Sequence, residues 1–75
     1  MNQLQVCLAN NMKRYRKLRG LSQEKLAELM RQRGVDIDRM AISSIENRER
    51  SVSDYELVAL SEIYGVSLAW LMGRE

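Results

Sequence analysis

The segment 39–47 brings together side chains that are able to recognise a hydrogen-bonding surface. On a helical wheel at about 100° per residue, Ile42 and Ile45 fall on one side. The opposite side collects residues that are mostly short, polar and uncharged: Arg39, Met40, Ser43, Ser44 and Asn47. Serine and asparagine are poor helix formers, so their use here favours contact with a partner over helix stability. The other interpretation of this pattern is a surface helix of weak propensity.

The chemistry of this polar side fits the edges of DNA base pairs. In the major groove, base edges offer donors, acceptors and thymine methyl groups to a helix. Arg39, near the expected start of the helix, suits a guanine edge, and Met40 suits a thymine methyl group. Ser43 and Ser44 suit base edges or phosphate. The segment therefore predicts base contacts from these four residues.

The sequence offers little for catalysis or metal binding. It has no histidine and one cysteine, Cys7, which removes the most frequent general base and any cluster of cysteine ligands. Cys7 has apolar neighbours and is interpreted as a packing residue, while Asp36 and Asp38 suit a turn and a helix cap. We expect no enzyme activity, no cofactor, no metal and no small-molecule ligand. The absence of a long apolar run or export signal predicts a cytoplasmic protein without membrane contact.

Charge is distributed unevenly along the chain. Residues 1–50 hold 11 basic and 6 acidic side chains, a net charge of +5, whereas residues 51–75 hold 1 and 4, a net charge of −3. The first two-thirds therefore carries a positive field that attracts a polyanion. Scattered charges on solvated helix faces are the alternative explanation.

The elements that position these residues are predicted from caps and stops to be five helices in one all-α domain, residues 1–75. They cover about residues 4–19, 23–33, 39–47, 54–65 and 68–72. The predicted N-terminal caps are Ser22, Asp38, Ser53 and Ser67, and the predicted stops are Gly20, Gly34, Gly65 and Gly73.

Glu46 falls at the edge of the apolar stripe of segment 39–47. A partly buried carboxylate needs a partner, and Arg16, on the inward edge of the first helix, is the candidate for a bidentate ion pair. The alternative is a free surface glutamate.

Three segments of the chain resemble one known family in order and spacing. Residues 20–27 (GLSQEKLA), 42–47 (ISSIEN) and 66–71 (VSLAWL) resemble the phage Cro and repressor type of helix-turn-helix, the XRE family. The resemblance covers about residues 8–72. It implies a compact lambda-repressor-like domain of five helices, with helices two and three forming the helix-turn-helix. It also implies sequence-specific binding of double-stranded DNA by a bacterial or phage-encoded, nucleoid-associated protein.

The resemblance assigns roles by position. It places Arg39, Met40 and Ser44 at base-reading positions with Ser43 beside them, and it pairs Arg16 with Glu46. Phosphate contacts are expected from Gln23 at a helix N-terminus, from Asn47, and from Arg48 and Arg50 in the segment that follows.

This sequence departs from the family pattern at two places. The link between helices two and three, residues 31–37, is longer than usual. We expect an extended second helix, a turn at Gly34, and Val35 or Ile37 covering the core. In addition, Arg48 stands where the family has glycine, so either Asn47 is left-handed or Arg48 is strained.

The resulting prediction is a transcriptional regulator, a repressor, that acts as a homodimer on a two-fold operator. The apolar tail comprises Val66, Leu68, Trp70, Leu71 and Met72. One interpretation is that it forms the dimer surface; the alternative is that Trp70 and Leu71 complete the core of the monomer. The alternatives are an antitoxin or a restriction-system controller with the same domain, or a helical protein-interaction module without DNA function.

Overall fold

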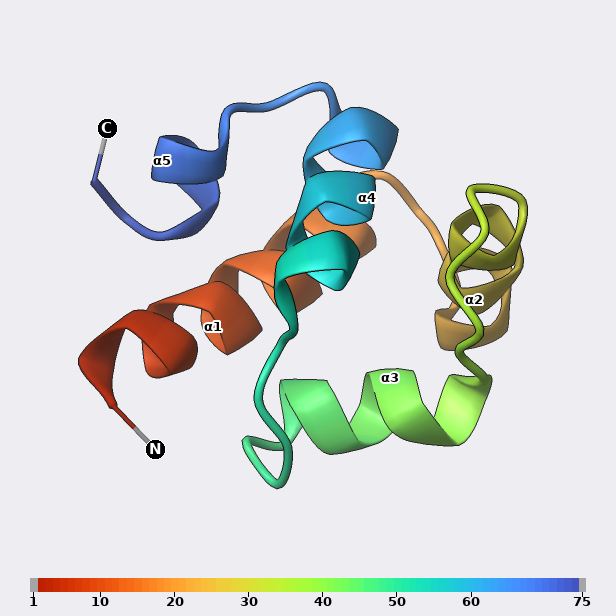
Figure 1. The fold of residues 1–75 in the computed structure, drawn as a ribbon, viewed down its shortest axis with the longest axis horizontal. Helices are drawn as coiled ribbons and strands as arrows, with labels where there is room; N and C mark the ends of the chain where they lie inside the picture. The colour runs from red at the N-terminus through yellow and green to blue at the C-terminus, as the bar shows by residue number, and fades with distance from the viewer. Residues whose placement is uncertain (1, 75) are drawn as a thin grey trace.

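A computed structural model describes residues 2–74, and within them the chain forms five helices and no strand (Figure 1). The helices are α1 (Gln3–Leu18), α2 (Gln23–Arg31), α3 (Arg39–Glu46), α4 (Asp54–Tyr64) and α5 (Leu68–Leu71). The prediction of an all-α fold with five helices is confirmed. Helix α1 runs through the middle of the molecule, α3 lies along one edge, and α5 lies at the opposite side beyond α4 (Figure 1).

Short polar side chains start the helices as the sequence predicts. Ser22, Asp38 and Ser67 accept hydrogen bonds of 2.9, 2.8 and 3.0 Å from the backbone N–H three residues further on. Each bond satisfies a donor that the first turn of a helix leaves without a partner. Asn2 caps α1 in the same way, by accepting from the Gln5 N–H at 2.9 Å.

The core forms where the apolar stripes of the five helices meet. Its fully buried large side chains come from every helix: Met12, Leu26, Met30, Ile42, Ile45, Leu60, Tyr64 and Leu71. Burial of one such side chain stabilises the fold by about 1.5–3 kcal/mol. The Tyr64 hydroxyl, deep in this core, donates to the Met12 carbonyl at 3.1 Å, so its polar end is satisfied.

The lengthened link between α2 and α3 is a packed connector. The expectation that α2 extends to residue 33 is wrong, because the helix ends at Arg31. Gly34, at φ +82°, then turns the chain. The Val35 N–H donates back to Met30 O at 3.1 Å, and Val35 and Ile37 are each only 4 % exposed. The additional residues therefore let two apolar side chains reach the core.

The loop between α3 and α4 is held by an ion pair. Arg50 donates to both carboxylate oxygens of Glu56, at 2.9 and 2.5 Å, and the Ser53 N–H donates to Glu56 Oε1 at 2.9 Å. The Glu56 side chain is 2 % exposed. Burial alone would raise the pKa of Glu56, but the hydrogen bonds from Arg50 and Ser53 outweigh it and lower the pKa.

Glu56→Gln should flatten the acid dependence of the free energy of unfolding. The pKa of Glu56 in the folded chain lies below its ordinary value of 4.5. The ionised carboxylate therefore stabilises the fold, and this stabilisation is complete above the ordinary pKa. This contribution is lost as the pH falls through the lower folded-state pKa. Denaturant unfolding between about pH 2 and pH 7 measures the effect. Equal pH profiles for the variant and the wild type would contradict this account of the loop.

Candidate nucleic-acid interface

Helix α3 presents its polar side outward and its isoleucines inward. Met40 is 68 % exposed, whereas Ile42 and Ile45 are 0 % and 1 % exposed. Arg39 and Asn47 are exposed, and Ser43 and Ser44 are half-buried. Within the described residues, no other helix covers the outer side of α3 (Figure 1). The structure thus gathers the predicted base-reading side chains on one free face.

A buried carboxylate holds α3 in place against the two preceding helices. Arg16 donates from Nε to Glu46 Oε2 at 2.7 Å and from Nη2 to Glu46 Oε1 at 3.0 Å. Its third nitrogen, Nη1, donates to Leu21 O at 2.7 Å. The hydrogen bond to Glu46 raises the pKa of Arg16, so the guanidinium stays charged. Arg16 and Glu46, which the sequence paired, are therefore in bidentate contact.

Gln23 joins this cluster from the first residue of α2. Its Nε2 donates to Glu46 Oε1 at 3.1 Å, so the carboxylate ties α1, α2 and α3 together. The position of Gln23 at a helix N-terminus suits an anion, because the first backbone N–H groups of a helix have no partner within it. The side-chain bond to Glu46 is a structural role that the sequence did not reveal.

Arg48 is the residue that takes the left-handed conformation at the end of α3. Its φ is 63°, whereas Asn47 has φ −87°. Of the two alternatives that the sequence left open, a left-handed Asn47 or a strained Arg48, the second is therefore correct. The Arg48 N–H donates to Ile45 O at 3.0 Å and the Glu49 N–H to Ser44 O at 2.8 Å, which closes the helix. The Arg48 guanidinium donates to Asn10 Oδ1 on α1 at 3.0 Å, a contact that sequence reasoning missed.

The two remaining predicted phosphate contacts also have partners within the chain. The Asn47 side chain lies 3.4 Å from Ser43 Oγ. The Arg50 guanidinium is taken up by Glu56 and also donates to Ser51 O at 3.0 Å, which gives it a structural role. Its side chain keeps 40 % exposure, so its phosphate contact stays a prediction.

Breaking the Arg16–Glu46 pair on one side should destabilise the fold more than removing both partners. Glu46→Leu leaves a buried guanidinium without a counter-charge, at a cost of about 3 kcal/mol. Arg16→Met strands the carboxylate at a similar cost. The double variant should lose less free energy of unfolding than the two single losses added together.

The matched control for this cycle is the exposed pair of Arg33 and Glu62, whose nearest charged atoms are 3.4 Å apart. Glu62→Gln should cost less than about 1 kcal/mol. Denaturant unfolding measures all four variants, and strict additivity of the two core substitutions would contradict the coupling.

The fold and the free face of α3 define a helix-turn-helix DNA-binding domain, with α2 and α3 as its two motif helices. A family model described as helix-turn-helix matches residues 12–71. The chain belongs to this XRE-type helix-turn-helix family of DNA-binding transcription regulators. It is 35 % identical over 68 residues to the control protein C.SmaI of Serratia marcescens, an alignment that covers 91 % of this chain and 75 % of that protein. No solved structure was found to match the chain.

Two further findings concern other kinds of site. No helix within residues 2–74 is long and apolar enough to span a membrane. In the same part of the chain, no group of histidine, cysteine, aspartate or glutamate side chains is arranged to hold a metal ion.

Proposed function

We propose that the chain recognises a specific two-fold operator and represses transcription there as a homodimer. The observation that carries this proposal is the outward polar face of α3, anchored from beneath by Ile42, Ile45 and the Glu46 cluster. A helix held in this way enters the major groove as a rigid unit. Since the ligand is duplex DNA, the proposed place of action is the cytoplasm of the cell that carries it.

The proposed contacts divide into two kinds. Base edges are read from α3 by Arg39, Met40, Ser43 and Ser44. Backbone phosphates are bound by Gln23, Asn47, Arg48 and Arg50. Phosphate contacts fix the register of the domain on the duplex, while base contacts supply specificity. Because Gln23 and Arg48 lie at the two ends of the motif, their phosphate contacts would bracket the groove that α3 occupies.

Arg39→Ala should cost about 1–3 kcal/mol of binding free energy on the correct site and relax the preference at one base pair. Gln23→Ala should instead weaken binding to all sequences by a similar factor. Selection of bound duplexes from a random pool, followed by titration, gives both quantities. If Arg39→Ala keeps the full site preference, the base contact assigned to it is wrong.

The dimer surface is proposed on the part of the C-terminal tail that the monomer leaves open. Leu71 is 0 % exposed and belongs to the core. The Trp70 ring meets the Tyr15 ring edge-on, with centroids 5.1 Å apart. Leu71 and Trp70 therefore pack onto the core of the monomer. Leu68 is 39 % exposed, with Val66 and Met72 half-buried beside it in the sequence. Two copies with recognition helices roughly 34 Å apart would read one operator.

Leu68→Asp should weaken pairing of two copies, because it places a charge in the proposed dimer surface. Sedimentation with and without operator DNA measures the stoichiometry. The control is Val58→Asp on α4, where the parent side chain is 46 % exposed. A wild-type chain that stays strictly monomeric on operator DNA would refute the dimer.

The similarity to C.SmaI bears on the regulatory role. The sequence leaves open a phage-type repressor, an antitoxin and a restriction-system controller. Because C.SmaI is a control protein, the similarity supports a regulatory role for this chain, and the controller is the second candidate for that role. A pure protein-interaction module, the remaining alternative, would show no salt-sensitive affinity for DNA in gel shifts.

A further inference from the structure

The basic side chains of the chain fall into two groups according to their partners. Most of them bind a carboxylate, a carbonyl or an amide oxygen inside the protein: Arg16, Arg19, Lys25, Arg31, Arg33, Arg48 and Arg50. The others form no side-chain ion pair or hydrogen bond with residues 2–74: Lys13, Arg14, Lys17, Arg39 and Arg74. Three of these unpaired cations lie within five consecutive residues of α1, a concentration that needs an explanation.

Interactions within α1 do not explain this concentration. The helix has no acidic residue from Gln3 to Leu18, so no neighbour one turn away neutralises Lys13, Arg14 or Lys17. Like charges at this spacing destabilise a helix. The helix dipole favours cations only in the last turn, which accounts for Lys17 but not for Lys13. This face of α1 therefore keeps a positive charge that no carboxylate within residues 2–74 pairs with.

Lys13 lies on the side of α1 that contacts the end of α3. At about 100° per residue, it is about 60° from Asn10 and about 60° from Arg16 around α1. Asn10 accepts a hydrogen bond from Arg48, just beyond the end of α3, and Arg16 binds Glu46, the last residue of α3. Lys13 therefore lies around α1 between two residues that contact the end of α3 or the residue just beyond it.

Lys17 extends this positive surface toward the start of α2. It lies one turn beyond Lys13 and is exposed. Its neighbour Arg16 donates to Leu21 O, in the short turn that leads to Gln23. Lys13 is thus near the end of α3 and Lys17 is nearer the start of α2. Phosphate contacts are proposed at both of these places, from Arg48 and from Gln23.

We propose that Lys13 and Lys17 bind phosphates of the DNA backbone beside the groove that α3 enters. This inference rests on the proposed function. An ammonium group on a flexible stem binds phosphate as a point charge, so these contacts add affinity without sequence information. They also lengthen the footprint of the domain along the backbone, and they supply the external counter-charge that α1 lacks.

The double variant Lys13→Gln/Lys17→Gln tests this proposal through the salt dependence of affinity. Each lost phosphate contact flattens the slope of log affinity against log salt by about 0.9, so the pair should flatten it by about 1.8. Between about 50 and 200 mM salt the affinity of the variant should then fall about 12-fold less than that of the wild type. The ratio of affinities for a selected and a random duplex should not change.

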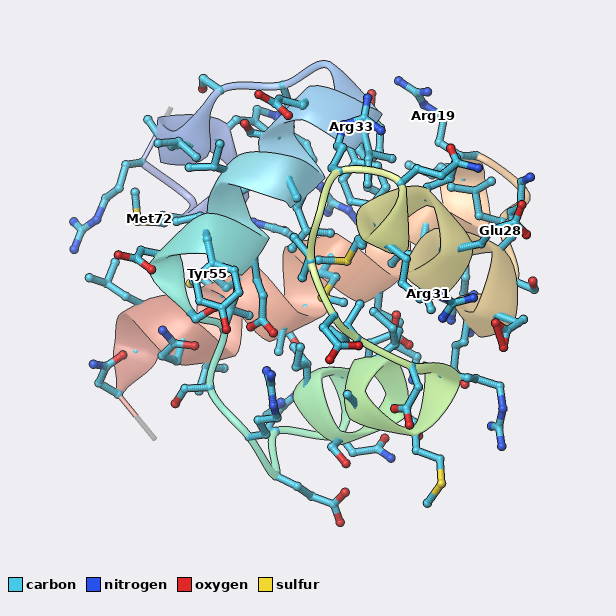
Figure 2. The ribbon with its side chains drawn as sticks, turned by 45° about the vertical axis from the view of Figure 1, so that its right-hand side comes forward. Arg19, Glu28, Arg31, Arg33, Tyr55 and Met72 are labelled. Atoms are coloured by element: carbon cyan, nitrogen blue, oxygen red, sulfur yellow. The ribbon has the colours of Figure 1, made fainter. Side chains whose placement is uncertain are left out.

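The control variant Arg33→Gln/Arg74→Gln removes the same charge away from α3. Arg33 contacts Glu62 at the far end of α2 from α3 (Figure 2), and Arg74 follows α5. Circular dichroism checks that both variants are folded. A slope change in the α1 variant no larger than in the control, or a changed sequence preference, overturns the inference while the wild-type data still support the proposed function. A wild-type chain without salt-sensitive DNA affinity overturns both.

Discussion

The arrangement of this domain depends on one buried carboxylate. Glu46 lies at the end of α3 and accepts hydrogen bonds from Arg16 on α1 and Gln23 on α2. Because a buried charge is stable only when its lone pairs are satisfied, the three helices must meet in one geometry to keep it. The isoleucines of α3 provide burial, which is non-directional, whereas the carboxylate fixes rotation and register. The polar side of α3 faces outward as a result of both.

The basic side chains of the chain are of two kinds: those that bind a partner within the fold, and those that form no ion pair or hydrogen bond with residues 2–74. Arg31 illustrates the first kind, since it donates to Ile37 O and Glu24 and so fastens the connector to α2. Arg19 donates to Tyr64 O and lies over the Tyr15 ring. Figure 2 shows Arg31 and Arg33 apart from one another beside α2; Arg31 pairs with Glu24 and Arg33 with Glu62. Net charge alone, at +2, would not reveal that three cations without a partner in residues 2–74, Lys13, Arg14 and Lys17, lie within five residues of α1.

Sequence reasoning succeeded where the controlling interactions are local or periodic. Caps such as Ser22 and Asp38 bond a backbone N–H three residues away, so a short window contains both partners. The contact of Arg16 with Glu46 was accessible because each residue lies at the edge of an apolar stripe. The free face of α3 follows from the same periodicity.

What the sequence did not reveal involves contacts between distant segments. Gln5 exchanges two hydrogen bonds with the backbone of Val52, and Asn11 donates to Leu71 O. No periodic pattern marks such side chain to backbone contacts. The same holds for Arg50, which donates to the side chain of Glu56 six residues away. The stop at Gly34 predicts an end of α2 at about residue 33, whereas the helix ends at Arg31, where the chain begins the turn that buries Val35.

Arg48, the left-handed residue at the end of α3, combines a strained backbone with a hydrogen bond to α1. A side chain at positive φ costs about 1–2 kcal/mol that glycine avoids, and a domain of this length has little stability in reserve. Glycine at position 48 would relax the backbone but would remove the hydrogen bond from the Arg48 guanidinium to Asn10 on α1. Arginine therefore ties the end of α3 to α1 at the cost of a strained backbone.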